Sequence, residues 1–266
     1  MTSKTLAIVG CGKLAEIVVD AVIDGILPDY QLIGLFSNNH EKVQRLAKKM
    51  QGADGSYVCT PCHTVEELLA LKPDYIVESA SPAAMKALAL PALKNGSSIV
   101  TLSVGVFADE EFYNEVKKVA RQNNTRVHIA SGAIGGFDVL RTVSLMGPCE
   151  ASIDTEKGPN SLKGTSVYDE TLQTEKRKVF EGNAKEAIAL FPTKVNVAVA
   201  ASLAAVGPMA MKVSVTSTPG YIGDDHRIEI NSDQVKAVID VYSETAQIAG
   251  WSVVNTLRNI MSPIVF

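Results

Sequence analysis

Residues 6–21 read LAIVGCGKLAEIVVDA, and this stretch decides the fold. Residues 6–9 are apolar and predict a short buried strand, residues 10–15 fit G-x-G-x-x-A, and an apolar helical pattern follows at once. In such a motif Gly10 permits the tight turn from strand to helix, and Gly12 lets the backbone approach a pyrophosphate. The helix that begins here directs N–H groups toward bound phosphates. We therefore predict a dinucleotide-binding turn, with contacts from Gly10, Gly12, Lys13 and Leu14, rather than a glycine-rich turn without a ligand.

With 266 residues, 46% of them hydrophobic and 20% charged, the chain is long enough for one large or two modest domains. Its formal net charge of −4 gives no electrostatic reason to expect a nucleic acid or an anionic membrane surface as a partner. Asn196, Ser202 and Pro208 interrupt the apolar stretch 195–211, which favours a buried helix over a membrane span. The first residues lack the apolar core of a signal peptide, so we expect a cytoplasmic protein.

Four cysteines are too few and too scattered for a disulfide framework. Cys59 and Cys62 form a C-x-x-C motif with His63 beside it. A redox pair needs a thioredoxin-like context, and a zinc site needs further ligands at suitable spacing. Because the sequence offers neither, we expect a loop that holds two thiols, and no metal site.

Strand and helix patterns alternate through the first half of the chain. Thr64 is the expected N-cap of one of these helices, with Glu67 completing a capping box. This alternation predicts a doubly wound parallel sheet of the Rossmann type. The expected strands are 31–36, 74–79, 98–102 and 126–130, with a short strand or loop at 58–62, and the expected helices are 41–50, 65–71, 83–94 and 109–123.

The end of the second strand normally carries an acid that binds the adenosine ribose and repels a 2′-phosphate. Here the corresponding positions hold Ser37 and Asn38. A carboxylate about 4 Å from a phosphate charge costs about 4 kcal/mol at an effective dielectric near 20, so its absence removes the main barrier to NADP. The cations Lys42 and His40 stand nearby. We predict that NADP is accepted alongside NAD, and Ala80, directly after the strand at 74–79, is a further candidate cofactor contact.

The pattern changes after residue 130. A glycine-rich turn at 131–136 follows the last strand of the first half, where open α/β sheets place their ligands. The remainder is rich in strands, with a hairpin at 226–242 and a closing helix at 245–261, and predicts an α+β substrate domain. We expect a dinucleotide-binding domain over 1–130, a catalytic domain over 131–244, and a closing segment, 245–266, that packs back onto the first domain.

His226 is the candidate catalytic residue. It follows Asp224 and Asp225, whose field would raise its pKa, whereas burial would oppose that change. A histidine that titrates near neutrality suits general acid–base chemistry on a carbonyl or an imine. The alternative is a surface-loop histidine beside solvated acids.

Three motifs, taken in order, resemble the L-aspartate dehydrogenase family. They are the six residues Ser131-Gly132-Ala133-Ile134-Gly135-Gly136, the Phe-Pro segment that ends in Val195-Asn196-Val197, and the pair Asp225-His226. The resemblance covers essentially the whole chain and includes the opening glycine turn. It implies that Ala133 and Asn196 contact NAD(P), that His226 is the catalytic histidine, and that the protein is a homodimer with a Rossmann domain and an α/β catalytic domain.

The resemblance also implies a reaction, the oxidation of L-aspartate to iminoaspartate and then hydrolysis to oxaloacetate and ammonia. Lys194, Lys163 and the backbone amides of 132–136 are the candidates for binding the two substrate carboxylates. The chain departs from the family at Thr193-Lys194 and at 242–246, both near the expected substrate. Two alternatives therefore stay open: an oxidoreductase that acts on another amino, keto or hydroxy acid, and a non-catalytic NAD(P)-binding regulatory protein.

Overall fold

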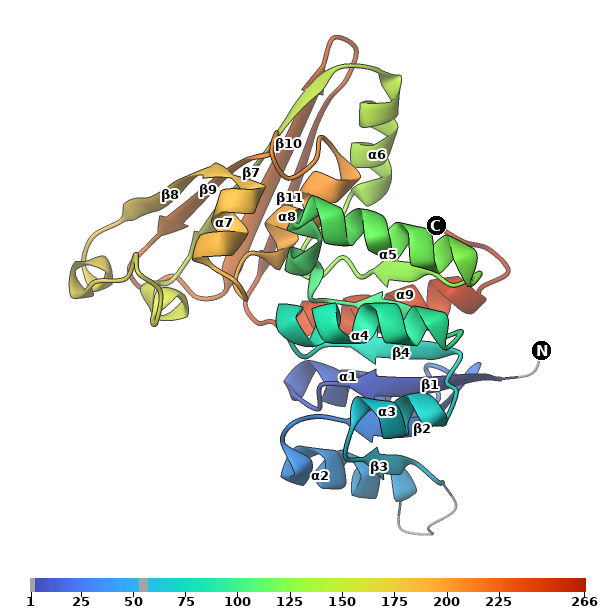
Figure 1. Ribbon diagram of the computed structural model, residues 1–266. Coiled ribbons are helices and arrows are strands. Elements are labelled where there is room, and N and C mark those ends of the chain that lie inside the picture. Colours follow the sequence, from blue (N-terminus) through green and yellow to red (C-terminus); the bar gives the residue numbers. More distant parts are fainter. Residues whose placement is uncertain (1–2, 53–56) are drawn as a thin grey trace. The chain divides into compact units, whose positions relative to one another are not determined.

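The opening turn joins a strand to a helix in the computed structural model, which describes residues 3–52 and 57–266 (Figure 1). The chain divides into two compact units by the density of its internal contacts. The first unit comprises Met1–Val106, Glu110–Ala130 and Ala249–Phe266, and the second comprises Phe107–Asp109 and Ser131–Ile248.

The first unit is built on a six-stranded parallel sheet in the order β3-β2-β1-β4-β5-β6. Its strand order reverses direction between β1 and β4, and this is where doubly wound sheets bind their ligands. The order confirms the predicted Rossmann-type sheet. Its strands are β1 (Lys4–Val9), β2 (Tyr30–Phe36), β3 (Thr60–Cys62), β4 (Tyr75–Glu78), β5 (Ser98–Thr101) and β6 (Val127–Ile129).

Helices cover both faces of this sheet, as parallel strands that are apolar on both sides require (Figure 1). α9 shares one hydrophobic cluster with α1, α2 and the strands beneath them, and the Tyr30 hydroxyl donates to the Leu257 carbonyl at 2.9 Å. The helices are α1 (Lys13–Ile23), α2 (His40–Gln51), α3 (Val65–Ala70), α4 (Pro82–Lys94), α5 (Glu110–Gln122) and α9 (Gln247–Met261), with a 3₁₀ turn, η1 (Val104–Ala108), after β5.

The N-terminus of α3 differs in one detail from the sequence prediction. Thr64 caps the helix by accepting from the Glu67 amide at 3.1 Å, as expected. The Glu67 carboxylate, however, accepts from the His63 amide at 2.7 Å, one residue before the cap. The prediction of a reciprocal capping box is therefore wrong. Glu67 instead accepts a hydrogen bond from the segment that connects β3 to α3.

The second unit is built on a five-stranded mixed sheet in the order β11-β10-β7-β9-β8. β10 and β11 form the predicted hairpin, β10 pairs antiparallel with β7, and β7 pairs parallel with β9. Its strands are β7 (Cys149–Lys157), β8 (Arg177–Asn183), β9 (Lys212–Ser217), β10 (Asp224–Ser232) and β11 (Lys236–Ser243). Its helices are α6 (Phe137–Met146), α7 (Ala184–Leu190) and α8 (Asn196–Ala204), with 3₁₀ turns η2 (Pro159–Leu162) and η3 (Glu170–Gln173).

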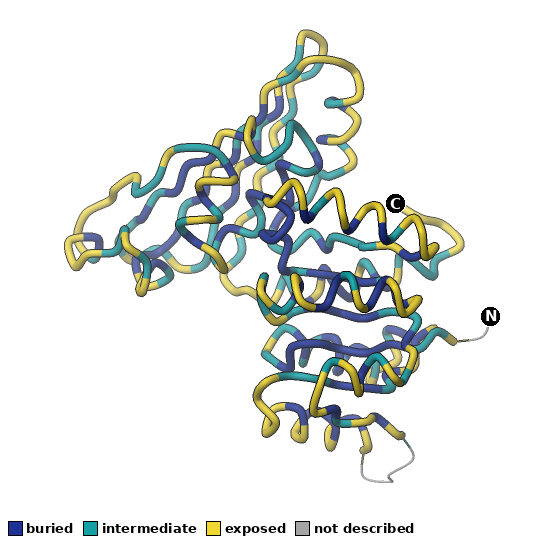
Figure 2. Tube along the Cα trace, viewed as in Figure 1, coloured by how far each residue is buried: buried dark blue, intermediate teal, exposed yellow. Residues whose placement is uncertain are grey.

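Burial follows the strands in each unit and the inward sides of the helices (Figure 2). In the second unit Ile153, Val213 and Ile228 lie side by side on one face of the sheet and are fully or almost fully buried. The period-2 alternation of β7 and β10 thus decides which side chains face inward. Among the described residues, no helix is long and apolar enough to cross a membrane.

Candidate functional site

The predicted phosphate-binding residues lie at the carboxyl edge of the first sheet. Gly10 adopts a left-handed φ of +98°, and a Cβ atom there would lie 2.7 Å from the Ala80 backbone nitrogen. Ser79 also joins these two segments with hydrogen bonds: its amide donates to the Val9 carbonyl at 3.0 Å, and its hydroxyl donates to the Gly10 carbonyl at 3.2 Å. Only glycine satisfies both the φ angle and this close approach. The turns after β1 and β4 are therefore held together at the point where the strand order reverses.

The N-terminus of α1 fits a pyrophosphate. Gly12 is its N-cap residue and provides no side-chain hydrogen bond, whereas Asn39, Thr64 and Ser81 cap α2, α3 and α4 with their side chains. A Cβ atom built on Gly12 would meet nothing within 4 Å. The first turn of α1 thus presents amide groups, among them those of Lys13 and Leu14, next to open space. A bound anion satisfies such groups and the positive end of the helix dipole.

Glu78, a residue that the sequence analysis did not identify, stabilises this edge of the sheet through hydrogen bonds to the segments that follow β4 and β5. Its carboxylate is fully buried and accepts four hydrogen bonds. Burial raises the pKa of Glu78, while the four donors act in the opposite direction. The residue fixes the turns that follow β4 and β5. The donors are the amides of Ala80 (2.9 Å) and Ser81 (3.1 Å) and the hydroxyls of Thr101 (2.7 Å) and Ser103 (3.0 Å).

The end of β2, where the adenosine ribose is expected, carries no acid. Ser37 accepts from the Asn39 amide at 3.4 Å, and Asn39 in turn caps α2. The rings of His40 and His63 lie 4.9 Å apart between centroids, which brings the ends of β2 and β3 side by side. The three residues that follow β2, Ser37 to Asn39, are therefore neutral, and the first acid is Glu41 in the first turn of α2.

In the second unit, His226 lies on β10 and is almost completely buried, with 2% of its surface exposed. The register pairs it with Thr155 on β7, whose hydroxyl lies 3.0 Å from His226 Nδ1. With its hydrogen on Nδ1, the ring donates to Thr155 and keeps a lone pair on Nε2. His226 is therefore not the surface-loop histidine of the alternative interpretation.

Burial, the largest cause, and the charge of Lys157 together lower the pKa of His226 to about 4, although Asp224 acts in the opposite direction. The two acids before His226 do not act together. The alternation of β10 places Asp224 on the same face as His226, whereas Asp225 faces the other side, where burial and Asp240 raise its pKa. Of the two opposing effects that the sequence suggested, burial is therefore the stronger.

The other predicted residues of this unit lie around the start of α8. A Cβ atom on Gly132 would lie 3.7 Å from Val197 Cγ1, so the 131–136 turn that contains Ala133 passes next to the first turn of α8, which Asn196 begins. Gly136 has a left-handed φ of +71° and begins α6, and a Cβ there would lie 2.6 Å from Ile239 on β11. The unit thus brings the 131–136 turn next to Asn196, and its register buries His226.

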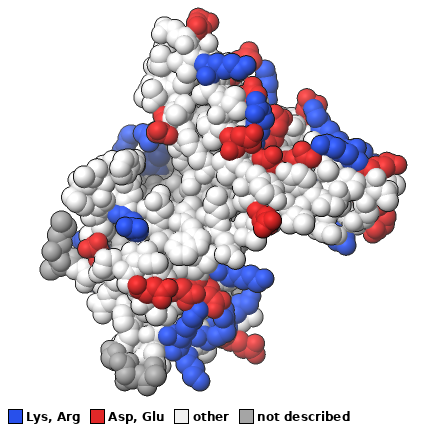
Figure 3. Space-filling model, turned by 180° about the vertical axis from the view of Figure 1, so that it is seen from behind, with Lys and Arg blue, Asp and Glu red and all other residues white. Residues whose placement is uncertain are grey.

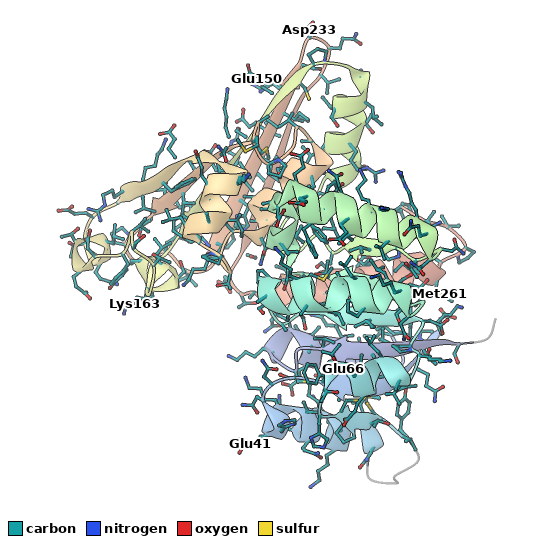
Figure 4. The ribbon with its side chains drawn as sticks, in the orientation of Figure 1. Glu41, Glu66, Glu150, Lys163, Asp233 and Met261 are labelled. Atoms are coloured by element: carbon teal, nitrogen blue, oxygen red, sulfur yellow. The ribbon has the colours of Figure 1, made fainter. Side chains whose placement is uncertain are left out.

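Lys157 is a second residue that sequence reasoning missed. It ends β7, pairs in register with Asp224, and its ammonium lies 3.3 Å from Asp224 Oδ2 and 3.4 Å from the Lys194 carbonyl. The two lysines that the sequence suggested for binding the substrate carboxylates, Lys194 and Lys163, contact other groups. Lys194 donates to the carbonyls of Ser161 and Lys163. Lys163 lies on the loop after β7 (Figure 4). Its ammonium is 5.9 Å from the centre of the Tyr168 ring.

The thiols of the C-x-x-C segment are buried. Burial raises the pKa of Cys59 to about 12 and also raises that of Cys62, so both thiols are protonated at neutral pH. Across the described residues, no group of three or more His, Cys, Asp or Glu side chains is placed to hold a metal ion. On the face that Figure 3 shows, Lys and Arg side chains are interspersed with Asp and Glu.

Comparison with known proteins assigns the two halves of the chain separately. Residues 10–130 match the family model described as "Homoserine dehydrogenase, NAD binding domain". Residues 138–260 match the model described as "Aspartate dehydrogenase, C-terminal". A solved structure titled as aspartate dehydrogenase from Thermotoga maritima superposes with a TM-score of 0.74 at 26% identity, covering 99% of both chains.

Curated relatives extend over the full length. The chain is 29% identical to the L-aspartate dehydrogenase of Methanococcus maripaludis over 270 residues, and 32% identical to that of Methanosarcina acetivorans over 271 residues. Each alignment covers 97% of both proteins. With the two glycine turns, the Asn196 segment and the buried histidine all in place, this chain belongs to the L-aspartate dehydrogenase family.

Proposed function

We propose that this protein oxidises L-aspartate with NAD(P)⁺ and water to give oxaloacetate, ammonium, NAD(P)H and a proton. The observation that carries the proposal is the buried His226, held by Thr155 on the sheet of the unit that matches the aspartate dehydrogenase model. An amino acid dehydrogenase needs a base of this kind at the substrate carbon, and a protein that only binds the cofactor does not.

The cofactor fits the first unit. The uncapped start of α1 and the open space beside Gly12 suit the pyrophosphate, and the Ser79–Ala80 backbone borders the same turn. When bound, the nicotinamide supplies the redox chemistry by accepting a hydride from the substrate Cα. The contribution of the chain to this step is to bind and orient the two reactants.

His226 supplies the proton chemistry of the hydrolytic half. Because its pKa is lowered, the imidazole is neutral at pH 7 and its Nε2 can take a proton from the water that attacks the imine carbon. In the tautomer with its hydrogen on Nδ1, the ring donates to the Thr155 hydroxyl, which lies 3.0 Å away and keeps the ring in that orientation. The proton from the water then passes to the departing amino group, and the proton of the new hydroxyl group goes to solvent as the carbonyl forms. The imidazole is therefore neutral again when ammonia has left.

A screen of NAD(P)H formation tests the proposal against both alternatives. We expect turnover with L-aspartate that exceeds turnover with L-alanine, L-glutamate, L-malate and L-lactate, followed by the rise in absorbance at the wavelength of the reduced cofactor. Higher turnover with a hydroxy acid or another amino acid would show that L-aspartate is not the preferred substrate, although the protein would still be an NAD(P)-dependent oxidoreductase. Tight cofactor binding with no turnover of any substrate would favour a regulatory protein.

We further propose that NADP is accepted alongside NAD. The neutral side chains of Ser37 and Asn38 remove the usual repulsion of a 2′-phosphate, and His40 lies beside them at the start of α2. We also propose a homodimer, on the resemblance to the family, and light scattering measures that state directly.

Ser37→Asp is expected to weaken NADPH binding by about 10- to 100-fold while leaving NADH binding within about threefold, because the new carboxylate stands where a 2′-phosphate would lie. Asn124→Asp is the matched control, because it adds the same charge at an exposed position of the same unit. Asn124 precedes β6 and so lies at the amino ends of the strands, whereas Ser37 follows β2 at the carboxyl ends, where the cofactor is expected. Titration of cofactor fluorescence gives both dissociation constants. Equal weakening of NADH and NADPH in the Ser37 variant would contradict the placement of the 2′-phosphate.

A further inference from the structure

Lys157 is a charged side chain buried beside the proposed catalytic histidine. It ends β7, and only 3% of its side chain is exposed. Thr155 and Lys157 stand on the same face of that strand, two residues apart, and pair with His226 and Asp224 on the same face of β10. The lysine and the histidine are therefore neighbours on one surface of the sheet, and the charge of Lys157 lowers the pKa of His226.

A buried ammonium is costly unless it is paired, so its retention beside a catalytic base requires a reason. Its two acceptors among the described residues are Asp224, at 3.3 Å, and the Lys194 carbonyl, at 3.4 Å. Asp224 is itself 36% exposed, so the ion pair is open to solvent from the carboxylate side. An ammonium carries three N–H donors, so a third acceptor can join without displacing the first two.

The reaction needs such a cation. L-aspartate differs from most amino acids by its side-chain carboxylate, which lies only two bonds from the Cα that reacts. When His226 acts at Cα, the side-chain carboxylate of the substrate is therefore only a few ångströms from the imidazole. Lys157 is offset from His226 by two residues along the strands, which corresponds to about 7 Å, so its ammonium is within reach of that carboxylate. Lys157 and Asp224 are the charged groups that act on His226, and neither Lys194 nor Lys163 is among them. Lys157 is the lysine whose charge reaches His226.

We propose that Lys157 binds the side-chain carboxylate of the substrate, and that this contact selects a dicarboxylic amino acid. The inference rests on the proposed aspartate dehydrogenase function. In the absence of substrate, Asp224 is the carboxylate among the described residues that balances the ammonium. In the complex, the ammonium bridges Asp224 and the substrate carboxylate, and a substrate without that carboxylate leaves the site without its charged partner.

The test compares two substrates that differ only in that group, L-aspartate and L-asparagine. Lys157→Gln is expected to lower kcat/KM for L-aspartate by about 10- to 100-fold, because a charge-assisted hydrogen bond contributes about that factor. The same variant is expected to keep kcat/KM for L-asparagine within about threefold or to raise it. Lys212→Gln is the matched control, because Lys212 pairs with Glu150 at an exposed site on β9 and has no role in the site.

A second variant keeps the inference testable if Lys157→Gln does not fold. Asp224→Asn removes the negative charge that would stand beside the substrate carboxylate on the same ammonium, so less repulsion is expected to lower the KM for L-aspartate several-fold while the KM for L-asparagine stays unchanged. A purely structural ion pair gives no such gain. Equal losses for both substrates, or no loss for L-aspartate, would overturn the role of Lys157 while the wild-type turnover of L-aspartate stands. Absence of wild-type turnover would instead reject the proposed function together with the inference.

Discussion

Replacing His226 with alanine is expected to lower kcat for L-aspartate oxidation by about 10²–10⁴-fold, the usual contribution of one general acid–base group. NADPH binding is expected to stay unchanged, because the proposed pyrophosphate contacts all lie in the other unit. Steady-state kinetics and a fluorescence titration of NADPH measure the two effects. His128→Ala is the matched control, a half-buried strand histidine of the first unit, and it should keep kcat within about threefold. Wild-type kcat in the His226 variant would remove it from the mechanism.

The pH profile of the wild type gives an independent check on the same residue. A base works in its neutral form, and burial lowers the pKa of His226 to about 4. The rate, kcat/KM, is therefore expected to show no loss from this group between about pH 7 and about pH 5, and to fall only as the imidazole takes up a proton below that range. An acid limb centred near the ordinary histidine value of about 6.5 would show that the ring is solvated in the working enzyme.

The sequence could not decide the protonation of His226, because the answer depends on register. The motif Asp224-Asp225-His226 places two acids before the histidine, but alternation along a strand sends neighbouring side chains to opposite faces. Only Asp224 shares the face of His226, and it is paired with Lys157. Which strand pairs with β10, and in what register, is a long-range property that a local pattern does not contain.

The architecture, by contrast, was predictable from local patterns. The apolar run before Gly10, the helix after it and the repeated alternation through residue 130 predict a doubly wound sheet, and the observed strand order confirms it. Apolar periodicity and turn residues act over a few positions, so they are visible in one sequence. The hairpin of β10 and β11 was visible for the same reason, because the sequence predicts a turn at 231–234 between two strands rich in β-branched residues. In the structure β10 extends through Ser232, so the turn is shorter than predicted and spans 233–235.

Lys157 and Glu78 were missed for two different reasons. The sequence pattern predicts a strand over 150–156, which stops one residue before Lys157, whereas β7 extends to Lys157. Extending the alternation of Ala151, Ile153 and Thr155 by two residues would have put a lysine on the inward face. Glu78 ends a buried strand, which is an unusual place for an acid, but its four donors come from two separate segments and could not be assigned from the sequence.

Gly10→Ala and Gly12→Ala are expected to damage the protein in different ways, although both glycines belong to one motif. At Gly10, a left-handed φ of +98° costs a side chain about 1–2 kcal/mol, and its Cβ would lie 2.7 Å from the Ala80 backbone, an overlap that costs about 1–3 kcal/mol more. The chain without cofactor should therefore lose stability, with Tm lower by several degrees.

At Gly12 the φ is −85° and a Cβ meets nothing within 4 Å, so Gly12→Ala should leave the Tm of the cofactor-free protein within about one degree of wild type. The added methyl group would instead fill the space that a pyrophosphate takes beside the uncapped start of α1, and the Kd for NADPH should rise at least about tenfold. Thermal melts without cofactor and fluorescence titrations with it separate the two effects. Wild-type affinity in the Gly12 variant would mean that the phosphates lie elsewhere. A Gly10 variant as stable as wild type would mean that the turns after β1 and β4 can move apart, and that their contact does not fix the edge on which the cofactor binds.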